Sequence, residues 1–192
     1  MNRFLLRALL QIVLILSGLI SIKAQFNRFG GGLSFNTPIS SPDLHIGNPG
    51  FNFRGIYEYN RKFFVIPSIT FQLPKTKHYT DPNLGNIEKL TLLASIDVNV
   101  TYALAIEKEL LFYALVAPNF TNVYTDWKPE TVENKDKYEL CPGIGIGTGI
   151  EMIVEKNINA YAQIEYIFGK YEQLVISIGI HYYFEGRIRR IW

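Results

Sequence analysis

Apolar and polar side chains alternate along eight short segments of the chain, most clearly in residues 90–102. Even positions in this segment carry Leu, Leu, Ala, Ile, Val, Val and Tyr, whereas odd positions carry Thr, Leu, Ser, Asp, Asn and Thr. Successive side chains of a β-strand point to opposite faces, so the pattern predicts a strand with one apolar and one polar face. Eight such strands predict a closed antiparallel barrel.

The connections between the strands alternate in length. The predicted strands cover residues 29–36, 51–59, 63–73, 90–102, 111–120, 140–153, 158–168 and 174–184. Short turns follow the second, fourth and sixth strands. Long polar loops follow the first, third and fifth, at 37–50, 74–89 and 121–139, while the last connection, 169–173, is short. This pattern is typical of outer-membrane barrels, with both termini on the periplasmic side.

Charged residues indicate which face points inward. Lysines lie almost entirely in the predicted turns and loops, the apolar faces carry no charge, and the polar faces carry mainly Ser, Thr, Asn, Gln and Gly. An Arg or Lys at the lipid midplane costs about 2–4 kcal/mol, and a membrane excludes open sheet edges. The pattern therefore favours an all-β, eight-stranded antiparallel up-and-down transmembrane β-barrel. The alternative is a soluble periplasmic ligand-binding barrel with the apolar face inside.

Aromatic residues gather near both ends of the predicted strands. Two aromatic belts are expected where a membrane barrel crosses the lipid interfaces, although β-propensity alone also enriches aromatics in strands. The predicted girdle residues are Phe51, Tyr57, Tyr59, Phe63, Phe71, Tyr102, Phe112, Phe120, Tyr166, Phe168, Tyr182 and Phe184.

The first 24 residues read as an export signal. Arg3 and Arg7 precede an apolar run, and cleavage is expected after Ala24. The alternative, an uncleaved anchor, needs a longer apolar run. The predicted division is a signal peptide (1–24), an outer-membrane barrel (25–184) and a short basic periplasmic tail (185–192). Removing the signal changes the net charge from +2 to −1, because Lys23 also leaves, so nucleic acid is not an expected partner.

The last predicted strand, Ser-Ile-Gly-Ile-His-Tyr-Tyr-Phe at 177–184, resembles the closing strand of small outer-membrane barrels of the OmpA/OmpX type. The resemblance covers the mature chain as a pattern of architecture. It implies that outer-membrane lipids and the barrel-insertion machinery are partners, since the machinery recognises the terminal aromatic. The tail beyond Phe184 departs from the family pattern. Its arginines predict contact with a periplasmic partner or with lipid phosphates.

Several ionisable residues fall on the polar face. We expect an interior polar network centred on Arg54, with Asp97 and Glu165 as its partners, because buried charges need partners. An eight-stranded barrel has room for side chains but hardly for a channel. Structural filling of the interior is therefore favoured over an ion path or gate. The predicted network comprises Arg54, Glu58, Asp97, Glu151, Glu165 and His181.

Two features of single strands lead to local predictions. Pro67 lies inside the third strand, where it cannot donate to a ladder, and it predicts a bulge. The sixth strand carries glycine at 143, 145, 147 and 149, and this strict alternation lacks the spacing of a phosphate loop. These glycines are expected to make space for bulky inward residues such as Phe64 or Tyr161, or to let the wall coil.

The candidates for chemistry are few. Ser177 and His181 share a strand face but lie ~13 Å apart, which excludes a hydrogen-bonded triad. His45 and His78 lie on predicted loops, and Cys141 is the single cysteine, so neither a cofactor nor a metal is expected. The leading hypothesis is a non-enzymatic structural, adhesive or envelope-assembly role, with an extracellular ligand at the long loops, which include Trp127. The alternative is a lipid-modifying outer-membrane enzyme.

Overall fold

The computed structural model describes residues 26–39, 48–81, 85–128 and 137–183. The predicted signal peptide, Phe184 and the basic tail lie outside these residues. The strands are β1 (Arg28–Pro38), β2 (Asn48–Glu58), β3 (Phe63–Gln72), β4 (Lys75–Asp81), β5 (Gly85–Glu107), β6 (Leu110–Lys128), β7 (Lys137–Glu155), β8 (Ile158–Gly169) and β9 (Gln173–Tyr183). Within the described ranges, no helix has the length and apolar character needed to span a membrane.

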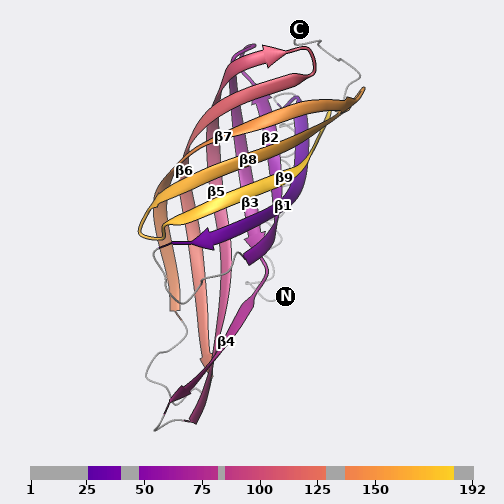
Figure 1. Cartoon of the computed structure of the whole chain (residues 1–192). Helices are drawn as coiled ribbons and strands as arrows, with labels where there is room; N and C mark the ends of the chain where they lie inside the picture. Colours follow the sequence, from indigo (N-terminus) through magenta and orange to yellow (C-terminus); the bar gives the residue numbers. More distant parts are fainter. Residues whose placement is uncertain (1–25, 40–47, 82–84, 129–136, 184–192) are drawn as a thin grey trace, which may run out of the picture.

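All strands belong to one antiparallel sheet that closes on itself. The order is β3-β2-β1-β9-β8-β7-β6-β5-β4, and pairing of β3 with β5 joins the two sides. β4 adds no ninth position to the wall. It follows β3 after Leu73 and Pro74 and pairs with the earlier part of the same β5 strand. The wall therefore has the eight positions predicted from the sequence, and its tilted strands wind around the barrel in Figure 1.

Short turns gather at one end of the barrel. They join β2 to β3, β5 to β6 and β7 to β8. Arg28 at the start of β1 lies opposite Tyr183 at the end of β9, so both ends of the described chain also lie there. The predicted short turns and the placement of the strand termini beside them are confirmed.

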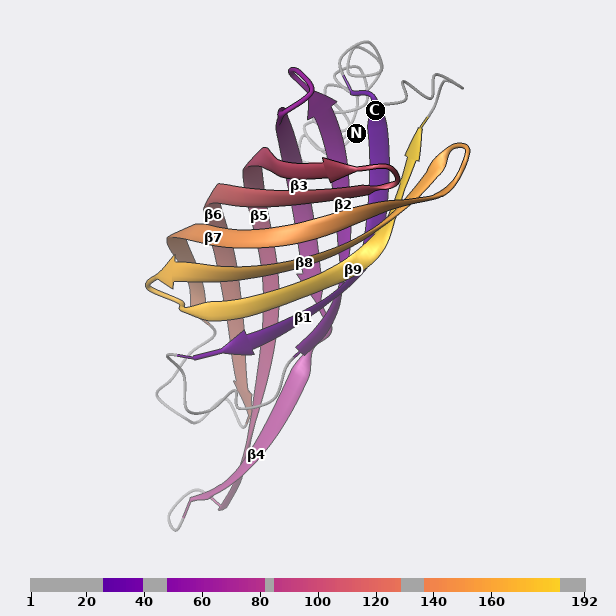
Figure 2. The ribbon, with the colours of Figure 1, turned by 45° about the horizontal axis from the view of Figure 1, so that its top comes forward.

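The long loops predicted at 74–89 and 121–139, at the other end of the barrel, are largely wrong. β5 already begins at Gly85, β6 runs to Lys128, and β7 begins at Lys137. Pairing of β2 with β3 stops at Gln72, and pairing of β8 with β7 stops at Gly143. The four strands β4–β7 therefore continue beyond the rest of the wall. We call residues 75–81, 85–92, 122–128 and 137–140 the projecting sheet (Figures 1 and 2).

Apolar side chains face outward and polar side chains face the lumen. In β2, Phe51 and Phe53 are 48% and 60% exposed, whereas Asn52 and Arg54 are 3% exposed. The same division holds around the barrel, and the apolar outer surface is far more extensive than the patches that soluble monomers expose. The predicted orientation is confirmed, and the soluble ligand-binding barrel, which needs an apolar lumen, is wrong.

The predicted girdle residues that the structure describes lie on the outer face. Near the short turns, the rings of Phe63 and Tyr102 lie 5.0 Å apart. Near the other end, Phe51 lies opposite Phe71 across β2 and β3. Tyr166 is half-buried, and its ring is 4.4 Å from that of Phe168. The two rows of aromatics have the positions expected at the two edges of an apolar band.

One wall of the lumen departs from the expected polar character. A buried apolar cluster lies on β2, β3, β5 and β6 and consists of Ile56, Phe64, Ile66, Ala103, Leu111, Tyr113 and Leu115. It packs together inside the barrel, so part of the interior resembles the core of a soluble protein. The same strands also carry buried polar side chains, among them Arg54, Ser68 and Asp97.

Pro67 does not produce the predicted bulge. Its pairing register with β5 is continuous, and the β2–β3 register is the same on both sides of it. Only the β2–β3 pairing is interrupted at Pro67, which is consistent with its missing N–H group. The irregularities that do occur lie between Ala103 and Ala105 and between Ile153 and Glu155.

The glycines of β7 do make space, but for other residues than predicted. A Cβ atom at Gly149 would collide with the ring and hydroxyl of Tyr113, and one at Gly145 would collide with the carboxylate of Glu165. Tyr161 instead lies over Gly179 of β9. Glycine is therefore required where a large inward side chain lies directly against the inner surface of a neighbouring strand.

Candidate functional site

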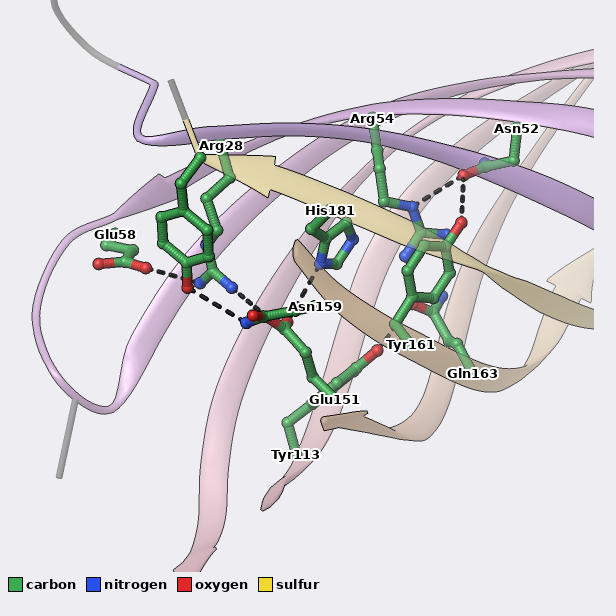
Figure 3. Close-up of polar contacts among 11 residues, drawn as sticks. Arg28, Asn52, Arg54, Glu58, Tyr113, Glu151, Asn159, Tyr161, Gln163 and His181 are labelled. Atoms are coloured by element: carbon green, nitrogen blue, oxygen red, sulfur yellow. Dashed lines mark hydrogen bonds and ion pairs between the residues drawn. The ribbon is translucent and has the colours of Figure 1, made fainter. Parts of the chain in front are cut away.

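Two groups of buried polar side chains lie inside the barrel (Figure 3). The Arg28 group comprises Arg28, Glu58, Glu151, Asn159 and His181 and lies near the short turns. The Arg54 group comprises Asn52, Arg54, Tyr161 and Gln163 and lies further along the barrel. They come from strands on several walls, so their contacts cross the lumen.

Arg28 bridges two carboxylates. Its Nη2 atom lies 2.6 Å from Oε1 of Glu58, and its Nη1 atom donates to Oε1 of Glu151. The same Glu151 oxygen accepts a 2.5 Å hydrogen bond from Nδ2 of Asn159. The Arg28 guanidinium also lies 4.9 Å from the ring centre of Tyr183. A buried ion pair needs such additional hydrogen bonds, because removal of each charge from water is costly.

His181 completes the Arg28 group and is fully buried. Its Nδ1 atom lies 3.2 Å from Oε2 of Glu151. Its ring stacks on that of Tyr161, with centroids 4.4 Å apart and planes inclined by 14°. The Tyr161 ring also contacts the Arg54 guanidinium, so this stack connects the two groups.

Arg54 is held by neutral partners. Its Nε donates to Oδ1 of Asn52 at 2.8 Å, and its Nη1 donates to Oε1 of Gln163 at 3.1 Å. The guanidinium carbon lies 4.1 Å from the ring centre of Tyr161, a cation–π contact. Asn52 in turn donates to Thr70, at 2.8 Å.

The acids predicted to pair with Arg54 have other hydrogen-bond partners. Asp97 accepts from Ser68 and from Asn99, both at 2.5 Å. Glu165 accepts from Gln163 at 3.2 Å. Among the described residues, Arg54 donates to amide oxygens rather than to either carboxylate. The predicted partnership of Arg54 with Asp97 and Glu165 therefore involves no direct hydrogen bond or ion pair among the described contacts, while all six residues of the predicted network do lie on the lumen side.

Arg28 was missed because the first strand was predicted to begin at Phe29. The signal was nevertheless present, since Arg28 shares its parity with Gly30, Gly32 and Ser34 on the polar face. The structure buries it to 1% exposure and gives it two carboxylate partners, Glu58 and Glu151. Extending the alternation by one residue would have placed it inside.

Hydrogen bonds join opposite walls at several levels. The Arg28–Glu151 contact joins β1 to β7, and the Arg54–Gln163 bond joins β2 to β8. Nearer the projecting sheet, Asn36 donates to Gln173 at 2.7 Å, and Gln173 donates to Thr121 at 3.2 Å. β1 and β7, β2 and β8, and β9 and β6 are not neighbours in the wall. These bonds therefore tie together strands that the sheet pairing does not join.

The other candidates for chemistry lie apart from one another. Ser177 and His181 both face the lumen from β9 and are buried. His78 is exposed on β4, with Nδ1 3.5 Å from Oε1 of Glu88, and His45 lies outside the described residues. Cys141 is buried. In the part of the chain that the structure covers, no three His, Cys, Asp or Glu side chains are grouped as metal ligands.

Trp127 lies in the projecting sheet, on β6. Its ring centre is 4.9 Å from Nζ of Lys89 and 6.1 Å from the ring centre of Tyr79. On the opposite face of this sheet, the rings of Tyr124 and Tyr138 lie 4.6 Å apart. The segments predicted as ligand-binding loops therefore present ordered strand surfaces.

Comparison with known proteins identifies the fold. No protein-family model and no curated protein matches the chain. Among solved structures, it resembles OprG from Pseudomonas aeruginosa (12% identity, TM-score 0.63), covering 84% of this chain and 97% of that one. Neisserial surface protein A gives 17% identity and a TM-score of 0.59, covering 82% and 96%.

The attachment invasion locus protein Ail of Yersinia pestis is also similar, at 16% identity and a TM-score of 0.57. The match covers 82% of this chain and 97% of Ail. Ail has also been solved with the heparin analogue sucrose octasulfate. The chain therefore has the fold of the small OmpA/OmpX-type outer-membrane barrels, an eight-stranded antiparallel up-and-down transmembrane β-barrel.

Proposed function

We propose that this protein is a non-enzymatic outer-membrane barrel that displays the projecting sheet outside the cell and acts there by binding. The observation that carries the proposal is that β4–β7 continue past the apolar band as paired strands. Their outward face changes from apolar to charged, from Leu92 to Glu88 on β5 and from Phe120 to Asp126 on β6. Charged side chains on both faces of a sheet fit water rather than lipid.

We further propose that the lumen is plugged and that its network is structural. The cross-lumen bonds of Arg28, Arg54 and Gln173 fill successive levels of the interior, and each carries side chains with almost no exposure. An eight-stranded barrel is just wide enough for such filling. Reconstituted protein is accordingly expected to give no steady conductance in planar bilayers, and open channels of stable conductance would contradict the plug.

The geometry gives little support to a lipid-modifying enzyme. Ser177 and His181 are enclosed in the lumen, away from lipid. His78 has only Glu88 as a charged partner among the described residues, and a dyad without a nucleophile does not transfer an acyl chain. Binding by the projecting sheet is supported instead by its charged and aromatic side chains beyond the apolar band.

The test is display on intact cells. An epitope inserted between β4 and β5 should be labelled on unbroken cells, while one inserted in the β7–β8 turn should be labelled only after the outer membrane is broken. The outer-membrane fraction should contain a band whose mobility changes on boiling, as expected of a folded barrel. Labelling of the β7–β8 turn alone would reverse the orientation, and recovery of the protein in the soluble periplasm would overturn the proposal.

A further inference from the structure

Two oxygen atoms buried in the lumen accept no hydrogen bond from the described residues. They are Oδ1 of Asn99 on β5 and Oε1 of Glu165 on β8. These two residues are only 1% and 5% exposed. A buried acceptor without a donor loses the hydrogen bonds that it makes in water, and the cost is greater for a charged oxygen. A ligand that attracts oxygen atoms would offset this cost.

Both oxygens border the small side chain of Ala117 on β6. The register of β5 and β6 on either side of Asn99 places this residue opposite Ala117, and Ala117 pairs with Gly145 of β7. A Cβ atom at Gly145 would collide with Oε1 of Glu165, so this carboxylate lies directly over the glycine. Asn99 and Glu165 therefore approach Ala117 from its two sides.

The amide of Asn99 has a fixed orientation. Its Nδ2 atom donates to Oδ1 of Asp97 at 2.5 Å and to the backbone oxygen of Ile66 on β3 at 3.4 Å. Only the amide nitrogen can donate, so a turned amide would place its oxygen against the carboxylate. Since Nδ2 points toward β3, Oδ1 points away from β3 and toward the β6 side, where Ala117 lies.

The carboxylates near this position outnumber the cations. Asp97 repels Glu165, and Arg54 attracts both. The second lumen arginine belongs to the Arg28 group, which has two carboxylates of its own. The inward-facing lysines of the described residues lie in the projecting sheet, and Lys89 on β5 is ~26 Å from Asp97 along the strand. Two carboxylates therefore share one arginine, and one buried negative charge is left uncompensated, which is costly.

There is room for a small particle beside the two carboxylates. Asp97 and Glu165 are 7% and 5% exposed although they lie inside the barrel, so a sphere of the size of a water molecule touches each residue. We propose that Glu165, Asn99 and Asp97 bind one alkali-metal cation, Na⁺ or K⁺, beside Ala117. Its single charge matches the uncompensated negative charge.

The ligand atoms of this site are carboxylate and amide oxygens, which suit hard cations rather than the transition metals that prefer thiolate or imidazole. A divalent ion would leave an uncompensated positive charge, and Mg²⁺ gives up its waters reluctantly. The three residues come from β5 and β8, which are not neighbours in the wall, so no spacing along the sequence indicates the site. The inference goes beyond the proposed function, since it concerns the lumen and not the ligand of the projecting sheet.

The test measures the stability of the full chain, refolded in an uncharged detergent, in NaCl, KCl and choline chloride at equal concentration. EDTA neutralised with Tris removes divalent ions, and circular dichroism follows the loss of strand in urea. Choline is too large for the site. We expect Na⁺ or K⁺ to raise the urea midpoint above that in choline. At a salt concentration ten times Kd, the folding constant should rise about elevenfold.

Three variants locate the effect. E165Q removes the charge with little change of shape and should abolish the difference between the salts. A117V fills the space beside the two oxygens without changing any charge and should abolish it too. E58Q is the matched control, because it changes a carboxylate of the Arg28 group to an amide and should retain the difference. Each variant is compared with itself in the three salts, so a general loss of stability does not affect the result.

Equal midpoints of the unchanged protein in the three salts would overturn the site, because protons or water would then satisfy the two oxygens. Persistence of the difference in E165Q or in A117V would also overturn it, and so would its loss in E58Q. A117V decides alone if E165Q does not refold. These failures are distinct from failure of the proposed function, because epitope labelling reports display and bilayer conductance reports the plug.

Discussion

The lumen and the projecting sheet share strands β5, β6 and β7 but accommodate charged side chains in different ways. In the lumen, charges such as Arg28 and Glu151 are almost fully buried and have partners on opposite walls. In the projecting sheet, lysines lie beside other lysines and beside aromatics. Buried charges without partners are strongly destabilising, whereas partly exposed ones are tolerated. The comparison fits our proposal that the lumen network stabilises the barrel and that the projecting sheet binds.

The largest expected effect is that of breaking the Arg28 group. R28A leaves Glu58 and Glu151 buried without their cation and should cost about 3–5 kcal/mol of unfolding free energy. Urea titration of folded barrel, followed by the gel mobility of unboiled samples, measures this loss. K77Q in the projecting sheet is the control and should leave the urea midpoint unchanged. An unchanged midpoint in R28A would mean that water already solvates these carboxylates.

A charge on the outer face tests where the membrane lies. Ile146 is 54% exposed and lies midway between the rows of Phe112 and Phe120, so I146R should cost about 2–4 kcal/mol in lipid. Tyr138 faces outward in the projecting sheet, where Y138R should cost only about 0–1 kcal/mol. Refolding into liposomes with urea titration compares the two. Equal losses of unfolding free energy in I146R and Y138R would mean that the membrane does not end between the wall and the projecting sheet.

Loss of Arg54 should be milder than loss of Arg28. R54A removes two hydrogen bonds to amides and a cation–π contact but leaves no carboxylate without its hydrogen-bond donors, so about 1–3 kcal/mol is expected. The same urea titration applies, and the double variant R28A/R54A measures coupling through the Tyr161–His181 stack. A cost in R54A as large as that in R28A would show that Asp97 and Glu165 depend on Arg54 after all.

The smallest effect is expected at an exposed ion pair. A hydrogen bond to the Glu139 carboxylate raises the pKa of Lys170. The stabilisation linked to a raised lysine pKa is fully present below the ordinary lysine pKa and is lost as the pH rises through the folded-state value. Solvent screens this exposed pair, so K170A should show no measurable change in urea midpoint at neutral pH. A change comparable to that in R54A would assign the pair a role in the barrel.

Much of this outcome could be predicted from alternation alone. Parity placed Asn52 and Arg54 inside and Phe51 and Phe53 outside, because side chains of a closed wall have only two directions. The ends of strands were harder to predict. Residues 85–89 and 121–128 were predicted as loops. Beyond the apolar band both faces of a strand contact water, so apolar and polar residues no longer alternate and the strand pattern is lost. Arg28 was left out of the first predicted strand for the same reason, because it lies at the end of the strand.

The sequence by itself determined the eight wall positions, the direction of each side chain and the apolar band, since all three depend on a period of two along single strands. Tertiary structure decided which inward residues meet. The stagger of the closed barrel brings β1 against β7 and β2 against β8 across the lumen, and this selects Glu151 for Arg28 and Gln163 for Arg54. Cross-lumen partners depend on barrel tilt and shear, which no single strand encodes.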